Sequence, residues 1–165
     1  LWMQVSWSIC LFGVQMTYAS QNIKNFSYDK DTRNISHRYF CFVCIVITSL
    51  IAKRFEKGEK PYTAEELSNE NRIPIRLTKQ VLGTLQDLNL IHEVLSDEKS
   101  EDIGFQPSVD ICRLSVGLIM NRIETNGSEA FRIDKVRRFN PHWQILKDYE
   151  DDSFDKLSQI LVKDL

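Results

Sequence analysis

The fold is decided by residues 61–108, which read PYTAEELSNENRIPIRLTKQVLGTLQDLNLIHEVLSDEKSEDIGFQPS. This stretch opens with Thr63-Ala64-Glu65-Glu66, a capping box in which Thr63 accepts a backbone N–H and Glu66 reaches back to the backbone of Thr63. The box predicts a short helix that ends near Asn71. Pro74 suits the first turn of a second helix. The inward face of that helix is predicted from apolar residues at helical spacing, namely Ile75, Leu77, Val81, Leu82, Leu85 and Leu88.

A hairpin is predicted after the second helix. Residues 91–95 and 104–108 are typical of two strands, and the turn between them, 96–102, holds four acidic residues against the single Lys99. Two short helices followed by a hairpin indicate a winged helix-turn-helix. The predicted fold class is therefore mainly α with a small β-hairpin, in which the winged helix is preceded by an apolar, membrane-type helix and followed by short amphipathic helices.

The domain extends on both sides of this stretch. Ser36 is predicted to cap a helix that stops at Gly58, and its apolar run over residues 39–52 has the length of a buried core helix rather than of a membrane span. Downstream, Ser115 begins a helix that Asn126-Gly127 ends. The winged-helix domain is accordingly predicted to span residues 36–127.

The first 22 residues are apolar and carry no charge before Lys24. About 20 helical residues reach roughly 30 Å, the thickness of a hydrocarbon core. Residues 1–22 are therefore predicted to form a last transmembrane-type helix, with a soluble amphipathic helix as the alternative, and the start at Leu1 suggests a longer protein. Residues 23–35 are predicted to be a polar linker, whose lysines and arginine place the chain after about residue 22 in the cytoplasm.

The tail, residues 128–165, is predicted to hold a basic strand or loop followed by two amphipathic helices. The basic part is 131–138, and the helices begin at Pro141 and Ser153. Their apolar faces need a covering surface. The predicted cover is the domain itself, other helices of a longer chain, or a second copy that dimerises through the C-terminal helices. A membrane is predicted as a further partner, through residues 1–22.

Charge argues against a nucleic-acid partner. Between Glu59 and Glu129, 13 acidic and seven basic residues leave the winged-helix region near −6, although the whole chain is at −2. Lys and Arg contacts to phosphate supply most non-specific DNA affinity, so nucleic acid is predicted to be an unlikely partner. The alternative rests on Arg76, Lys79 and Gln80, which lie on the outward face of the second helix, where a DNA reader places its base contacts.

Residues with catalytic or metal-binding chemistry do not cluster in the sequence. His37, His92 and His142 are far apart, and no glycine-rich phosphate loop or nucleophile elbow is found. Cys41 and Cys44 form a C-x-x-C without a second cysteine pair to complete a zinc site. The prediction is a protein that is not an enzyme, with no catalytic, cofactor or metal residues.

Several strings resemble the YihY/BrkB family of inner-membrane proteins, historically labelled ribonuclease BN. The resemblance covers residues 1–125 and is carried by residues 13–19, 59–67, 73–77 and 104–111. It implies a polytopic inner-membrane protein of uncertain activity, with transport as one candidate. The winged helix would then be its cytosolic interaction or regulatory module. No residue of the sequence supports the ribonuclease label.

A second resemblance stays open beside the first. Residues 63–90, the hairpin and the helix within 110–127 are also similar to Rrf2-type transcription regulators, which join a winged helix to a longer dimerisation helix. Those regulators often hold an iron–sulfur cluster on grouped cysteines, whereas Cys112 stands alone here. The alternative function is therefore a winged-helix DNA-binding transcription regulator.

Overall fold

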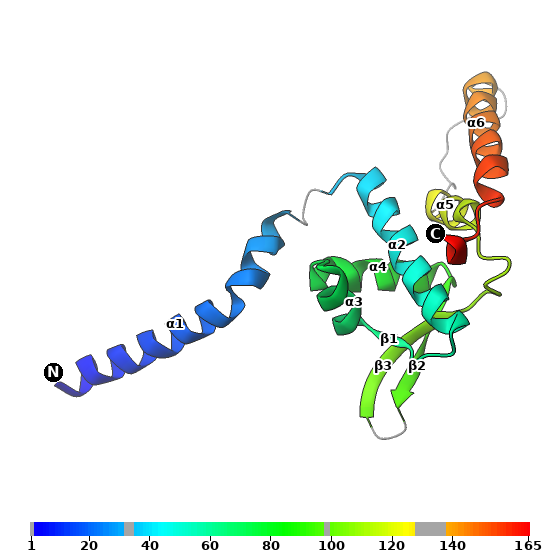
Figure 1. The fold of residues 1–165 in the computed structure, drawn as a ribbon. Coiled ribbons are helices and arrows are strands. Elements are labelled where there is room, and N and C mark those ends of the chain that lie inside the picture. Colours follow the sequence, from blue (N-terminus) through cyan, green and yellow to red (C-terminus); the bar gives the residue numbers. More distant parts are fainter. Residues whose placement is uncertain (1, 32–34, 98–99, 128–137) are drawn as a thin grey trace.

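The computed structural model describes residues 2–31, 35–97, 100–127 and 138–165 of the chain (Figure 1). Its centre is a winged helix, with three helices beside a three-stranded antiparallel sheet of order β1-β3-β2. The elements are α1 (Trp2–Asp31), α2 (His37–Glu56), β1 (Tyr62–Thr63), α3 (Ala64–Asn71), α4 (Ile75–Asp87), β2 (Ile91–Asp97), β3 (Ser100–Pro107), α5 (Val116–Glu124), α6 (Asn140–Ser158) and the 3-10 turn η2 (Val162–Asp164).

The sequence signals for the winged-helix elements are confirmed. The Ser36 hydroxyl accepts the Tyr39 N–H at 3.2 Å, and both hydrogen bonds of the Thr63–Glu66 capping box are present. The hairpin pairs Ile91 with Pro107 and Leu95 with Ile103. Sequence reasoning missed β1, the two-residue strand that pairs with Phe105 and Gly104, because two residues carry no alternation pattern.

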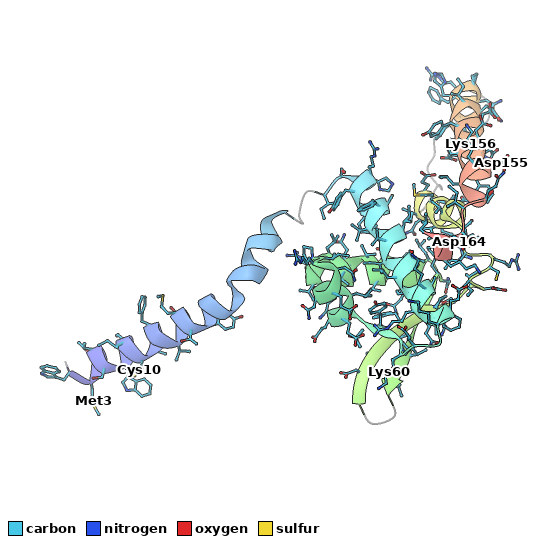
Figure 2. All side chains as sticks on the ribbon, viewed as in Figure 1. Met3, Cys10, Lys60, Asp155, Lys156 and Asp164 are labelled. Carbon is cyan, nitrogen blue, oxygen red and sulfur yellow. The ribbon has the colours of Figure 1, made fainter. Side chains whose placement is uncertain are left out.

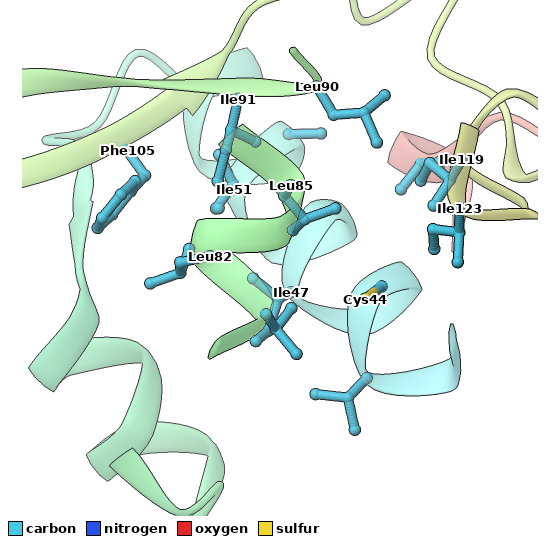
Figure 3. Packing of buried hydrophobic residues seen from close by; sticks show 14 of the residues in the cluster. Cys44, Ile47, Ile51, Leu82, Leu85, Leu90, Ile91, Phe105, Ile119 and Ile123 are labelled. Carbon is cyan, nitrogen blue, oxygen red and sulfur yellow. The ribbon is translucent and has the colours of Figure 1, made fainter. Parts of the chain in front are cut away.

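One core joins α2, α4, α5 and the base of the wing (Figure 3). Ile47 and Ile51 of α2 face Leu82 and Leu85 of α4, and Ile119 and Ile123 of α5 close the far side. The run predicted at residues 39–52 is thus a core helix, as expected. The buried Thr48 hydroxyl of α2 donates to the Cys44 carbonyl at 2.7 Å, so this donor is satisfied inside the core.

The C-terminus returns to this core. The Val116 N–H donates to the Ile160 carbonyl at 2.9 Å, and the Val162 N–H donates to the Leu114 carbonyl at 3.0 Å. These two bonds set Val162 fully inside the core, against α2. Lys163 then pairs with Glu56 at 3.1 Å, which fastens the end of the chain to the end of α2.

The predicted membrane span at residues 1–22 is wrong. Within the described residues, no helix is both long enough and apolar enough to cross a membrane. The apolar stretch is diluted by Gln4, Ser6, Ser8 and Gln15, and α1 continues through polar residues to Asp31 instead of ending at 22. Most of the predicted linker, 23–35, is therefore part of this helix. The predicted inner-membrane location, with residues after 22 in the cytoplasm, is withdrawn with the span.

Helix α1 extends away from the winged helix, and its side chains from Trp2 to Tyr18 are exposed (Figures 1 and 2). Its hydroxyl groups bond within the helix: Ser8 donates to the Gln4 carbonyl at 2.9 Å and Thr17 to the Gly13 carbonyl at 2.9 Å. None of the described side chains of α1 belongs to the buried core.

The tail contains one long helix where two were predicted. No proline or glycine interrupts residues 142–158, so α6 runs through Glu150-Asp151-Asp152 without a break. Its last turns pack on α5, and the rest projects beyond the domain (Figure 1). The basic segment predicted at 131–138 lies outside the described residues except for Arg138.

Candidate nucleic-acid interface

Helix α4 is the second helix of the helix-turn-helix, and one side of it faces outward. Leu77, Val81 and Leu85 bury the opposite side in the core. Arg76, Lys79 and Gln80, which were predicted to point outward, are all exposed. Their spacing of three and four residues places them together over about one helical turn. The structure thus gathers the three predicted residues into one surface, which we call the α4 face.

The C-terminal end of α4 is fixed by a contact that sequence reasoning did not identify. The Arg122 guanidinium, from α5, donates to the carbonyl oxygens of Leu88 and Asn89 at 2.7 and 3.0 Å. Asn89 follows with a φ of 52°, a left-handed turn that leads into β2. Helix ends leave carbonyls without helical partners, and a cation is favourable there. Arg122 therefore holds the end of α4 in place from α5, the fourth helix of residues 36–127.

A second unpredicted cluster fixes the start of α3. Arg54, near the end of α2, donates to Glu66 at 3.2 Å and lies 3.8 Å from the centroid of the Tyr62 ring. The Tyr62 hydroxyl donates to Glu70 at 3.1 Å. Burial raises the pKa of Tyr62, and its hydrogen bond to Glu70 raises it further. These contacts join α2, β1 and α3, so that the helix beneath α4 has a fixed orientation. Only the capping box gave a signal in the sequence.

The cysteines and histidines do not assemble into a second site. Cys41 and Cys44 lie on the buried side of α2, where burial raises the pKa of Cys41 and raises that of Cys44 to about 12. The Cys41 sulfur is 3.5 Å from His37 Nε2. His92 is exposed on β2, 3.2 Å from the Ser108 hydroxyl. Within the described ranges, no three histidine, cysteine or acidic side chains are placed to share a metal ion.

The charge beside the α4 face is negative. Between α3, α4 and the wing lies an open groove lined by Glu65, Glu66 and Glu70 of α3, and by Glu93 and Asp102 of the wing. Lys79 is the one cation among the described residues that line it. The side chains of residues 96–101, which hold the rest of the acidic wing turn, lie outside the described part. A polyanion approaching α4 would therefore meet attraction at Arg76 and Lys79 and repulsion on the groove side.

The fold is that of a winged helix, with the α4 face exposed on the second helix of its helix-turn-helix. No family model and no curated protein matches the sequence. Solved structures do match: IscR of T. potens has 15% sequence identity and a TM-score of 0.54, over 79% of this chain and 84% of that one. CymR of B. subtilis, described as its global cysteine regulator, has 16% identity and a TM-score of 0.52, over 79% and 94%. A putative transcriptional regulator of Listeria innocua has 14% identity and a TM-score of 0.52, over 76% and 82%.

These similarities establish the fold and correct the first resemblance. Two of these neighbours are described as regulators, and the similarities favour the alternative, Rrf2-type resemblance over the YihY/BrkB family. The predicted function as a module of an inner-membrane protein is wrong, because the matching structures are winged-helix regulators and no spanning helix is found in the described residues. The prediction that a membrane is a partner and nucleic acid an unlikely one is overturned by the same neighbours. Net charge is a weak guide to a partner, because it averages over faces that need not take part in binding.

Proposed function

We propose that residues 36–127 form the DNA-binding domain of a transcription regulator, in which α4 contacts the major groove. The observation that carries the proposal is the α4 face, where Arg76, Lys79 and Gln80 are exposed together on the second helix of a helix-turn-helix. In this motif the second helix is the one that enters the groove. The fold similarity to solved regulators supports the same assignment.

The three side chains supply different kinds of contact. An arginine can donate two hydrogen bonds to guanine, and a glutamine can pair with adenine, so Arg76 and Gln80 would read bases. Lys79 would neutralise a backbone phosphate. Leu77, Val81 and Leu85 hold α4 against the core, and Arg122 holds its end, so the α4 face is presented on a rigid element.

The negative charge of the domain should lower its affinity for DNA of random sequence. Affinity for random DNA should be weak, because the groove side of α4 repels phosphate. Recognition would then depend on base contacts from α4 more than on general attraction. Because few cations on this surface can neutralise phosphates, the affinity of the specific complex should depend only weakly on salt concentration.

Selection from a pool of random duplexes tests the proposal. The full chain, at micromolar concentration and low salt, should enrich a common sequence over several rounds. Arg76→Ala and Gln80→Ala should each weaken binding to the enriched duplex by about tenfold and relax the preferred bases, since one good base contact is worth about 1–3 kcal/mol. If no sequence is enriched, or if both variants bind like the parent, the proposal is wrong.

A further inference from the structure

The wing carries an apolar pair that no residue in the described part of the chain covers. Leu95 and Ile103 are direct partners across the hairpin, and so are Glu93 and Phe105, so the four side chains lie on one face of the wing. Phe105 is 7% exposed and belongs to the core, whereas Leu95 is 72% exposed and Ile103 is 49% exposed. The same sheet face is thus covered at its base and bare further out.

This bare face borders the groove between α3, α4 and the wing. The groove has a volume of about 800 Å³, and its apolar lining is Ala64, Leu82, Ile103 and Phe105. Ile103 belongs both to the groove and to the bare pair. The groove and the Leu95–Ile103 pair therefore form one continuous surface, which we call the wing groove. It follows the hairpin beside α4.

Gly83 has no side chain, so the backbone of α4 is accessible from the groove at this position. It lies inside the helix and lines the groove, and a Cβ added there would meet no atom within 4 Å. A glycine in a helix interior is less stable than an alanine. Packing within the described chain gives no reason for it. A glycine facing an open groove leaves room for the backbone of a bound segment.

The charges around the wing groove select the occupant. Glu66 is engaged by Arg54 and by the Thr63 backbone, and Glu70 by Tyr62. The side-chain carboxylates of Glu65, Glu93 and Asp102 make no hydrogen bond or ion pair with any residue that the structure describes. Apolar surface bordered by available carboxylates complements a segment in which apolar side chains alternate with Lys or Arg.

We propose that the wing groove binds a basic, extended peptide segment of a partner protein. Apolar side chains of the peptide pack on Leu95 and Ile103, its backbone passes Gly83, and its cations face Glu65, Glu93 and Asp102. This site is separate from the function proposed for the α4 face. Lys79 borders both surfaces, so the peptide and a duplex would compete only at that residue.

A fluorescein-labelled peptide of ten residues, in which Leu alternates with Lys and Arg, tests this site by anisotropy on the full chain. We expect saturable binding, and binding at least tenfold weaker for a peptide with Ser in place of Leu. The double variant Glu93→Lys, Asp102→Lys should weaken binding by about tenfold. The matched control, Asp148→Lys, Asp152→Lys, makes the same charge change on the exposed face of α6 and should bind like the parent.

Two further variants separate binding from folding and from DNA recognition. Gly83→Ala should keep or raise the midpoint of thermal unfolding and still weaken peptide binding at least threefold. Arg76→Ala should leave peptide binding unchanged, whatever it does to DNA binding, so the two proposals can fail independently.

Four results would overturn the assignment. They are equal binding of the Ser peptide, an equal loss in the α6 control, no loss in the Glu93/Asp102 variant, and no binding of the Leu peptide. A fifth would replace the occupant: if the Glu93/Asp102 variant instead abolishes self-association in sedimentation equilibrium, the wing groove is covered by a second copy and not by a basic peptide.

Discussion

At the scale of single residues, local signals were reliable where the chemistry involves near neighbours in the chain. The Ser36, Thr63 and Ser115 caps were predicted because each joins a hydroxyl to an N–H three residues away, and all three are present. Arg54 and Arg122 were missed because they act across 12 to 34 positions of sequence, on partners that no spacing rule connects. The predicted trio of the α4 face needed only helical periodicity to be placed.

Cys44 should make the free energy of unfolding decrease as the pH rises above 9. Burial in the core raises its pKa to about 12, against 9.0 for an unperturbed thiol. Between pH 9 and pH 12 the Cys44 thiol therefore stays protonated in the folded chain, whereas the same thiol ionises in the unfolded chain. Its contribution to stability is complete below pH 9 and declines as the pH rises from 9 toward 12, with a limiting slope of about 1.4 kcal/mol per pH unit.

Urea unfolding of the parent and of Cys44→Ala, both kept reduced, measures this effect. The alanine variant loses packing at every pH, so it should be less stable at pH 8. The difference in unfolding free energy between the two proteins should then shrink by about 1 kcal/mol between pH 9 and pH 10. Comparing the two proteins cancels the titration of other groups. A difference that is constant with pH would show that the buried thiol has an ordinary pKa.

At the scale of elements, the contact between α5 and α6 depends on a missing side chain. A Cβ on Gly117 would lie 2.7 Å from the Ser158 nitrogen and 3.0 Å from the Phe154 oxygen, which are both backbone atoms of α6. Backbone cannot rotate away as a flexible side chain can. Gly117 is therefore what allows the two helices to cross so closely, and the periodicity of either helix alone gave no sign of it.

Gly117→Ala should destabilise the chain by about 1–3 kcal/mol, because α6 must move away from α5. Gly83→Ala is a matched control on α4, where an added Cβ meets nothing within 4 Å, and it should stabilise by about 0.5–1 kcal/mol. The urea midpoints of the two variants should shift in opposite directions from the parent. Shifts of the same sign would contradict the close crossing of α5 and α6.

At the scale of the whole molecule, sequence reasoning placed the winged helix and failed at both ends. Apolar segments at 1–22 and after 141 were interpreted from composition, which does not record how far a helix continues. Residues 20–31 extend α1 into a polar helix, and Glu150-Asp151-Asp152 lies inside α6 instead of between two helices. Charge was averaged over the domain, although binding depends on which face carries it.

Helix α6 leads to a prediction about assembly. Ile145 and Tyr149 of α6 are each 70% exposed, and Leu146 is 45% exposed. The dimer through the C-terminal helices thus stays a prediction, with this apolar surface as its candidate contact. Sedimentation equilibrium should show a dimer that Ile145→Glu with Tyr149→Glu converts to a monomer, because burying two carboxylates is unfavourable. A parent chain that is monomeric at every concentration would refute it.

The most direct test is to measure, by fluorescence anisotropy at several salt concentrations, how tightly one selected duplex binds to the full chain and to its Lys79→Ala variant. Helix α4 carries the DNA contact in this account. The parent should therefore bind the selected duplex far more tightly than a scrambled one. Lys79→Ala should weaken both complexes and lower the slope of log affinity against log salt by about 1, as loss of one phosphate contact requires. Equal affinity for the two duplexes, or an unchanged slope, would contradict the central claim that α4 reads DNA.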